Sequence, residues 1–114
     1  MHSDAIVPRL RRRNPGERLR EAVLELSGGR ATLLSHREQS WASITFAGAR
    51  HRLELAFEGA EAVEAGELLI ALLPEHEFTI PGQLVADAEV TAVDHRLVPP
   101  RMQVSCEVLL LEDG

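Results

Sequence analysis

Hydrophobic and polar residues alternate along two long segments near the C-terminal end of the chain, residues 84–93 and 102–111. An alternation of period two is typical of a β-strand with one buried face. The connection at residues 96–100 contains Pro99 and Pro100, so the two segments are predicted to form an antiparallel hairpin. The face expected in the core carries Leu84, Ala86, Ala88, Val90, Ala92, Met102, Val104, Cys106, Val108 and Leu110. The face expected outside carries Val85, Asp87, Glu89, Thr91, Val93, Gln103, Ser105, Glu107, Leu109 and Leu111.

A second hairpin is predicted in the first half of the chain. Residues 41–47 and 51–57 alternate in the same way, and Gly48-Ala49 between them suggests a tight turn. In the second of these strands His51 falls on the apolar face, together with Leu53, Leu55 and Phe57. A short strand at 30–35 is expected before a polar turn at 37–40. Another is expected at 76–80, ended by the turn sequence Pro81-Gly82.

Two helices are predicted from their end signals. Asn14-Pro15-Gly16-Glu17 can cap a helix of residues 15–27 through both its Asn and its Glu side chains, and Gly28-Gly29 suits its end. A second helix is expected from Gly59 to residue 73, where Pro74 stops it. Its second half, residues 68–73, is apolar on all sides and is therefore expected to be buried.

The resulting order is helix, two or three strands, helix, and two or three strands. We predict an α+β two-layer sandwich in which an antiparallel sheet of four to six strands carries two helices on one face. The alternative is a hot-dog-like arrangement, with the sheet wrapped around the second helix. Residues 14–114 are expected to form one domain, preceded by a basic arm at residues 1–13.

Charge is divided unevenly along the 114 residues. The first 20 residues hold six of the twelve arginines and two acids, a net of +4, whereas the other 94 hold six arginines and sixteen acids, a net of −10. The absence of lysine is common in bacterial chains from GC-rich genomes, so no function is read from it. Arg9, Arg11, Arg12 and Arg13 could bind nucleic acid, but the acidic body opposes a phosphate backbone, and this partner is kept only as an alternative.

Candidate chemistry is sparse. The five histidines lie at positions 2, 36, 51, 76 and 95, without a metal-binding spacing, so neither a metal nor another cofactor is expected. Cys106 is expected to be a small buried hydrophobe. Asp87 and Glu89, about 6.5–7 Å apart along one strand face, are catalytic candidates together with His76, provided that a pocket encloses them. A small-molecule enzyme of hot-dog-like type that uses such carboxylates at a dimer interface is the second functional hypothesis.

The favoured hypothesis concerns the apolar residues on the predicted outer face. Val85, Val93, Leu109 and Leu111 lie there among acids, and an exposed apolar sheet face usually contacts a partner. We therefore expect a non-enzymatic binding or structural module that forms a homodimer through this face, with any small-molecule ligand unspecified. No apolar run reaches the roughly 20 residues of a membrane span, and no signal-peptide core is evident, so a cytoplasmic location is the default expectation.

Overall fold

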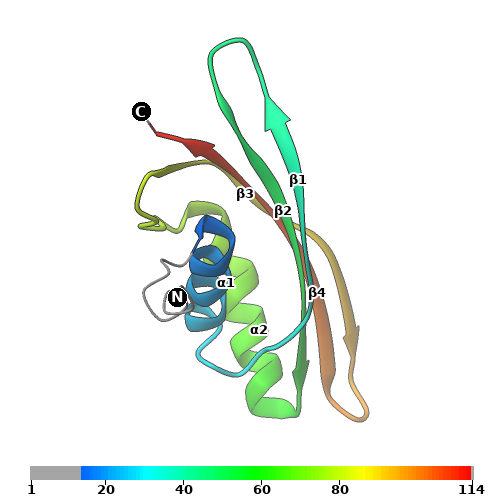
Figure 1. Ribbon diagram of the computed structural model, residues 1–114. Helices are drawn as coiled ribbons and strands as arrows, with labels where there is room; N and C mark the ends of the chain where they lie inside the picture. The colour runs from blue at the N-terminus through cyan, green and yellow to red at the C-terminus, as the bar shows by residue number, and fades with distance from the viewer. Residues whose placement is uncertain (1–13, 114) are drawn as a thin grey trace, which may run out of the picture.

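The computed structural model describes residues 14–113, which form two helices on one face of a four-stranded antiparallel sheet (Figure 1). In chain order the elements are α1 (Pro15–Leu26), β1 (Thr32–Ala42), β2 (Ala47–Glu58), α2 (Ala60–Leu72), the 3-10 helix η2 (Leu73–Glu75), β3 (Gln83–Arg96) and β4 (Arg101–Glu112). The strand order across the sheet is β1-β2-β4-β3. The predicted α+β class and layout are confirmed. The wrapped-helix alternative is wrong, because α2 lies beside α1 on one face of an open sheet.

Helix α1 begins where the sequence indicates. The Asn14 side chain accepts a hydrogen bond from the Glu17 backbone N–H at 2.8 Å, and the Glu17 carboxylate accepts one from the Asn14 N–H at 3.1 Å. This reciprocal capping satisfies two amide groups that the helix itself cannot. After the helix, Gly28 and Gly29 adopt positive φ angles of 67° and 71°, which glycine reaches without steric strain.

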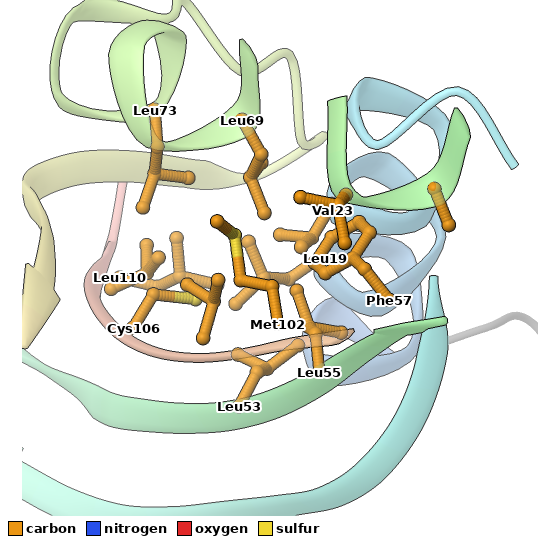
Figure 2. Packing of buried hydrophobic residues seen from close by; sticks show 14 of the residues in the cluster. Leu19, Val23, Leu53, Leu55, Phe57, Leu69, Leu73, Met102, Cys106 and Leu110 are labelled. Atoms are coloured by element: carbon orange, nitrogen blue, oxygen red, sulfur yellow. The ribbon is translucent and has the colours of Figure 1, made fainter. Parts of the chain in front are cut away.

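The core lies between the helices and the central strands, β2 and β4. Figure 2 shows Leu19 and Val23 of α1 and Leu69 of α2 directed toward side chains of the sheet. Helix α2 approaches the sheet closely at Gly66, where an added Cβ would lie 2.9 Å from the Met102 sulfur and 3.0 Å from the Phe57 ring. The amphipathic pattern of the sequence therefore placed the core correctly on α1 and on β4. The expectation that residues 68–73 of the second helix are buried is wrong in part: Leu69 and Leu73 are fully buried, whereas Leu68 and Leu72 are 57% and 48% exposed because they lie on the side of the helix away from the sheet.

The first hairpin is longer than predicted, and its turn lies elsewhere. Residues 37–40 continue β1 instead of forming a turn, and the chain reverses at Ser43–Phe46 instead of at Gly48-Ala49. The Ser43 N–H donates to the Phe46 carbonyl at 2.7 Å, and the Ser43 hydroxyl accepts from the Phe46 N–H at 3.1 Å. Polar residues are tolerated in this part of β1 because it is an edge strand whose hairpin projects past the helices (Figure 1).

The predicted strand at residues 76–80 is also absent. The chain runs there as an irregular segment after η2, and Ile80 is buried in the core. The rings of His76 and Phe78 pack edge to face, with their centroids 4.6 Å apart. Pro74 and Pro81 bracket this segment and lack the N–H group that a strand ladder needs.

Strand β3 departs from strict alternation at two β-bulges, one between Val85 and Asp87 and one between Val90 and Ala92. Each bulge inserts one unpaired residue, so the residues before it and the residues after it cannot both follow one unbroken alternation of faces. Consequently Leu84, opposite Leu111, lies on the outer face, whereas Val85, opposite Leu110, packs against the core. The predicted faces of these two residues are wrong. The faces predicted for Ala92 and Val93 are wrong for the same reason, because after the second bulge Ala92 lies opposite Ser105 on the outer face and Val93 opposite Val104 on the helix-bearing face.

Within residues 14–113, no helix has the length and apolar content needed to cross a bilayer.

Candidate functional site: the outer face of the sheet

The helix-free face of the sheet is organised as rows of cross-strand neighbours. Residues directly opposite one another on adjacent strands point to the same face and lie about 5 Å apart, so the strand register defines which side chains are neighbours. Three successive rows cross all four strands in the order β1, β2, β4, β3. We name them the charge row (Arg37, Arg52, Glu107, Glu89), the mixed row (Gln39, Arg50, Leu109, Asp87) and the apolar row (Trp41, Gly48, Leu111, Leu84).

The charge row places like charges beside each other. Arg37 is the direct partner of Arg52, and Glu89 is the direct partner of Glu107, so the row reads positive, positive, negative, negative across the sheet. Like charges directly opposite each other destabilise a strand pair. An alternating order of the same four residues would remove both unfavourable pairs, so the observed order needs another explanation.

Among residues 14–113, ion pairs in the charge row are confined to its centre. The Glu107 carboxylate accepts a hydrogen bond from Arg52 Nε at 3.0 Å and also contacts the Nη2 of that side chain. Its other oxygen lies 3.7 Å from Arg50 Nη1 in the adjacent mixed row. Glu107 is only 14% exposed, whereas Arg52 is 58% exposed. Partial burial strengthens this interaction relative to an ion pair in open water.

The two ends of the charge row are free. Across the part of the chain that the structure describes, neither the Arg37 guanidinium nor the Glu89 carboxylate makes a side-chain hydrogen bond or ion pair. Both side chains are exposed, and they lie on opposite edge strands of the sheet. On the Arg37 side, Arg37, Gln39 and Arg50 help to line an open hollow of about 290 Å³.

The mixed row has the same separation of basic and acidic residues as the charge row. Over the three rows, strands β1 and β2 contribute Arg37, Arg50 and Arg52, whereas β3 and β4 contribute Asp87, Glu89 and Glu107. The apolar row next to them carries no charge, and its Leu84 is 48% exposed. Over these three rows the face thus has a basic half, an acidic half and an apolar end. The rows beyond them do not continue this division, since β2 carries Glu54 and Glu58 there and β4 carries Arg101.

The four residues predicted as partner contacts are divided between the two faces. Leu109 and Leu111 lie on the outer face as expected, but they are only 8% and 6% exposed, because neighbouring side chains of the same chain cover them. Val85 packs against the core, and Val93, opposite Val104, points to the helix-bearing side with 46% exposure. The exposed apolar contribution to the outer face therefore comes mainly from Leu84, with the half-buried Trp41 in the same row.

The catalytic candidates do not form an enclosed site. His76 and Asp87 both line an open hollow of about 580 Å³ beside β3, whereas Glu89 lies in the charge row. All three side chains are exposed to solvent. Acid–base chemistry by paired carboxylates depends on enclosure, and this geometry does not provide it.

The structure brings together two histidines to which the sequence assigned no chemistry. His36 of β1 and His51 of β2 face α1, with His36 Nε2 and His51 Nδ1 3.0 Å apart. Arg20 of α1 donates from Nε to His36 Nδ1 at 3.2 Å. Because this arginine nitrogen can only donate, His36 carries its proton on Nε2 and donates to His51 Nδ1. His51 is only 1% exposed, and its position in an apolar alternation was the one sequence signal of this network.

Burial disfavours the charged form of both imidazoles. Burial lowers the pKa of His36, and the neighbouring His51 and Arg20 lower it further, whereas Glu38 acts in the opposite direction. Burial likewise lowers the pKa of His51, against a smaller opposing effect of Glu38, whose Oε1 lies 4.0 Å from His51 Nδ1. The Nδ1 atom of each ring already accepts a hydrogen bond, so a proton added there would point at the N–H group that donates to it. The hydrogen bonds from Arg20 to His36 and from His36 to His51 therefore require both rings to be neutral.

Cys106 and the possible metal ligands add no reactive centre. Cys106 is fully buried, and desolvation raises the pKa of its thiol to about 11, so the nucleophilic thiolate is disfavoured. Among residues 14–113, no group of three or more His, Cys, Asp or Glu side chains is arranged to hold a metal ion. The charges of the outer face remain the main unexplained feature of the described chain.

The basic arm of residues 1–13, with its candidate role in nucleic-acid binding, lies outside the described residues. Comparison of the chain with protein-family models, with curated proteins and with solved structures gives no match.

Proposed function

We propose that this protein is a non-enzymatic binding module that acts as a homodimer, joined through the outer face of its sheet. The observation that carries the proposal is the charge row, in which two like-charged pairs lie side by side and the two end residues, Arg37 and Glu89, have no partner among residues 14–113. In an isolated subunit this order is unfavourable. Against a surface with the reverse order it becomes favourable, because each charge then faces its opposite.

A second copy of the chain provides such a surface. A two-fold symmetric interface uses the same patch on both subunits, so the patch must be complementary to itself. The three named rows, with a basic half on β1 and β2 and an acidic half on β3 and β4, meet this condition, because rotation places one half over the other. The chain therefore carries its own complement, and no other protein is needed to explain the charges.

The size of the face is sufficient for a dimer. Four strands about 4.8 Å apart and six rows about 6.8 Å apart span roughly 750 Å². A standard specific interface buries about 800 Å² on each partner. The exposed Leu84 at the apolar end adds a hydrophobic contribution to a contact that is otherwise dominated by charge.

The proposal is tested by sedimentation velocity on the full chain and on two leucine variants. The unaltered protein is expected to be a dimer at micromolar concentration. Leu84→Glu is expected to weaken dimerisation at least about tenfold, because it introduces a carboxylate into the apolar row of the interface. Leu68→Glu is the matched control, since Leu68 is 57% exposed but lies on α2, on the opposite side of the sheet.

The two variants distinguish a specific interface from non-specific association. If Leu68→Glu weakens dimerisation as much as Leu84→Glu does, the contact is assigned to the helix-bearing side of the sheet. An unaltered chain that sediments as a monomer at every concentration would eliminate the proposal.

A further inference from the structure

We infer that the two-fold axis of the dimer runs parallel to the strands and passes between β2 and β4, so that β1 of one subunit faces β3 of its partner. This inference rests on the homodimer proposed above and specifies how its two subunits are arranged. Two arrangements of sheets packed face to face keep the strands aligned: one with the axis parallel to the strands, and one with the axis perpendicular to them in the plane of the interface. The rows of the outer face distinguish between them.

A parallel axis places the charge row on the partner's charge row in reverse order. Arg37 then faces the partner's Glu89, and Arg52 faces the partner's Glu107. The two charges that have no partner within the described chain pair with each other across the interface, twice by symmetry. Arg52 and Glu107 already form a pair within each subunit. In the dimer the two pairs form one network of four charges, in which each charge also faces a charge of opposite sign on the other subunit.

The apolar row supports the same axis. With a parallel axis, Trp41 of one subunit faces the partner's Leu84, so the apolar ends of the two sheets cover each other. A perpendicular axis would turn the partner end for end. An axis through the mixed row would bring the apolar row over the charge row, and an axis through the middle of the face would bring it over the opposite end. The opposite end carries the row of Glu58, Arg101 and Arg96, next to the row of Thr32, Ala56, Gln103 and Asp94. A polar row containing a carboxylate is a poor partner for Leu84.

The twist of the two sheets limits how many rows of one subunit can face the same rows of its partner. Packed sheets cross at about 30°, so facing strands diverge with distance from the crossing point. A crossing point at the mixed row keeps the charge, mixed and apolar rows close to register. Of these, the charge and mixed rows carry basic residues on one half of the sheet and acidic residues on the other.

The arrangement has a consequence for the exposed hairpin tips. A parallel axis leaves the strand direction unchanged, so both Ser43–Phe46 turns leave the dimer at the same end. Ile44 in this turn is fully exposed, and Phe46 is 46% exposed. The dimer would therefore present two apolar tips on one side, whereas a perpendicular axis would place them at opposite ends.

Charge reversal tests the arrangement directly. Arg37→Glu and Glu89→Arg, each alone, place like charges against each other across the proposed interface, and each is expected to weaken homodimerisation at least about tenfold at low salt. Mixing the two variants is expected to restore association as a heterodimer, because each reversed residue then meets its opposite. The double variant Arg37→Glu/Glu89→Arg is expected to form a homodimer again. Sedimentation velocity at low and high salt measures all four samples.

These variants keep the effect on folding separate from the effect on assembly. Within one chain, Arg37→Glu places a carboxylate beside Arg52, and Glu89→Arg places a guanidinium beside Glu107, so both replace a like-charged pair by an opposite one. The thermal stability of each monomer should therefore be maintained or raised. A loss of the dimer cannot then be attributed to unfolding.

The possible failures are distinguishable. If the unaltered chain is monomeric, the homodimer itself is wrong. If the unaltered chain dimerises but neither mixing nor the double variant restores association, Arg37 does not face the partner's Glu89 and the inferred axis is overturned. Single reversals with no effect on a dimeric chain would overturn it as well.

Discussion

Acidification below about pH 6.5 is expected to lower the free energy of unfolding through the buried pair His36 and His51. Burial lowers the pKa of both imidazoles in the folded protein, relative to an ordinary value of 6.5 in the unfolded chain. Over the interval between these values the unfolded chain binds more protons than the folded one, so falling pH favours unfolding. The stability is fully present above pH 6.5 and is lost as the pH falls toward the lowered values of the folded state.

The size of this effect has an upper limit. Each histidine can take up one proton, so it contributes at most about 1.4 kcal/mol of stability per pH unit. Glu38, 4.0 Å from His51 Nδ1, reduces the contribution because it favours the charged ring. Urea denaturation at a series of pH values between about 7 and 5 measures the slope.

A matched set of variants assigns the slope to the buried pair. His36→Gln combined with His51→Leu removes both titrating groups and is expected to flatten the profile between about pH 7 and 5. His76→Gln and His95→Gln, at exposed positions, should leave it unchanged. The assignment would be contradicted if the exposed-histidine variants flatten the dependence of stability on pH and the buried-pair variant does not.

Replacement of Phe57 by alanine is expected to destabilise the protein by about 3–5 kcal/mol. Phe57 is fully buried on β2, and its ring occupies the space beneath Gly66 of α2, where an added Cβ would lie 3.0 Å from the ring carbon Cδ2. Its removal leaves a cavity between the helix and the sheet that neither can close without losing other contacts. Since small domains are stable by only about 5–15 kcal/mol, much of the total would be lost.

Urea denaturation followed by circular dichroism measures this loss. Phe46→Ala is the control within the same strand pair, because Phe46 lies in the hairpin turn and is 46% exposed. We expect it to change stability by no more than about 0.5 kcal/mol. Equal losses for the two variants would show that the ring of Phe57 does not have the core role that its burial indicates.

The sequence by itself determined the elements whose signals are local. Asn14 and Glu17 cap α1 within one turn, and Gly28 ends the helix, so nothing distant is needed to define it. The alternation in β4 placed Met102 and Leu110 on the core face without error, because that strand pairs with both neighbours and none of its own residues is bulged out. The fold class followed from these elements and from the helix stopped before Pro74.

Tertiary structure alone decided which side chains share the outer face. A bulge in β3 moves Leu84 outward and Val85 inward, and a pattern of period two contains no sign of it. The charge row joins Arg37 to Glu89 through the pairing of β2 with β4, strands separated by more than 40 positions in the chain. That register depends on how α2 and the core fit between the hairpins. For this reason the sequence located a candidate partner surface on the last hairpin, but the charges that make the surface self-complementary became visible only when all four strands were aligned.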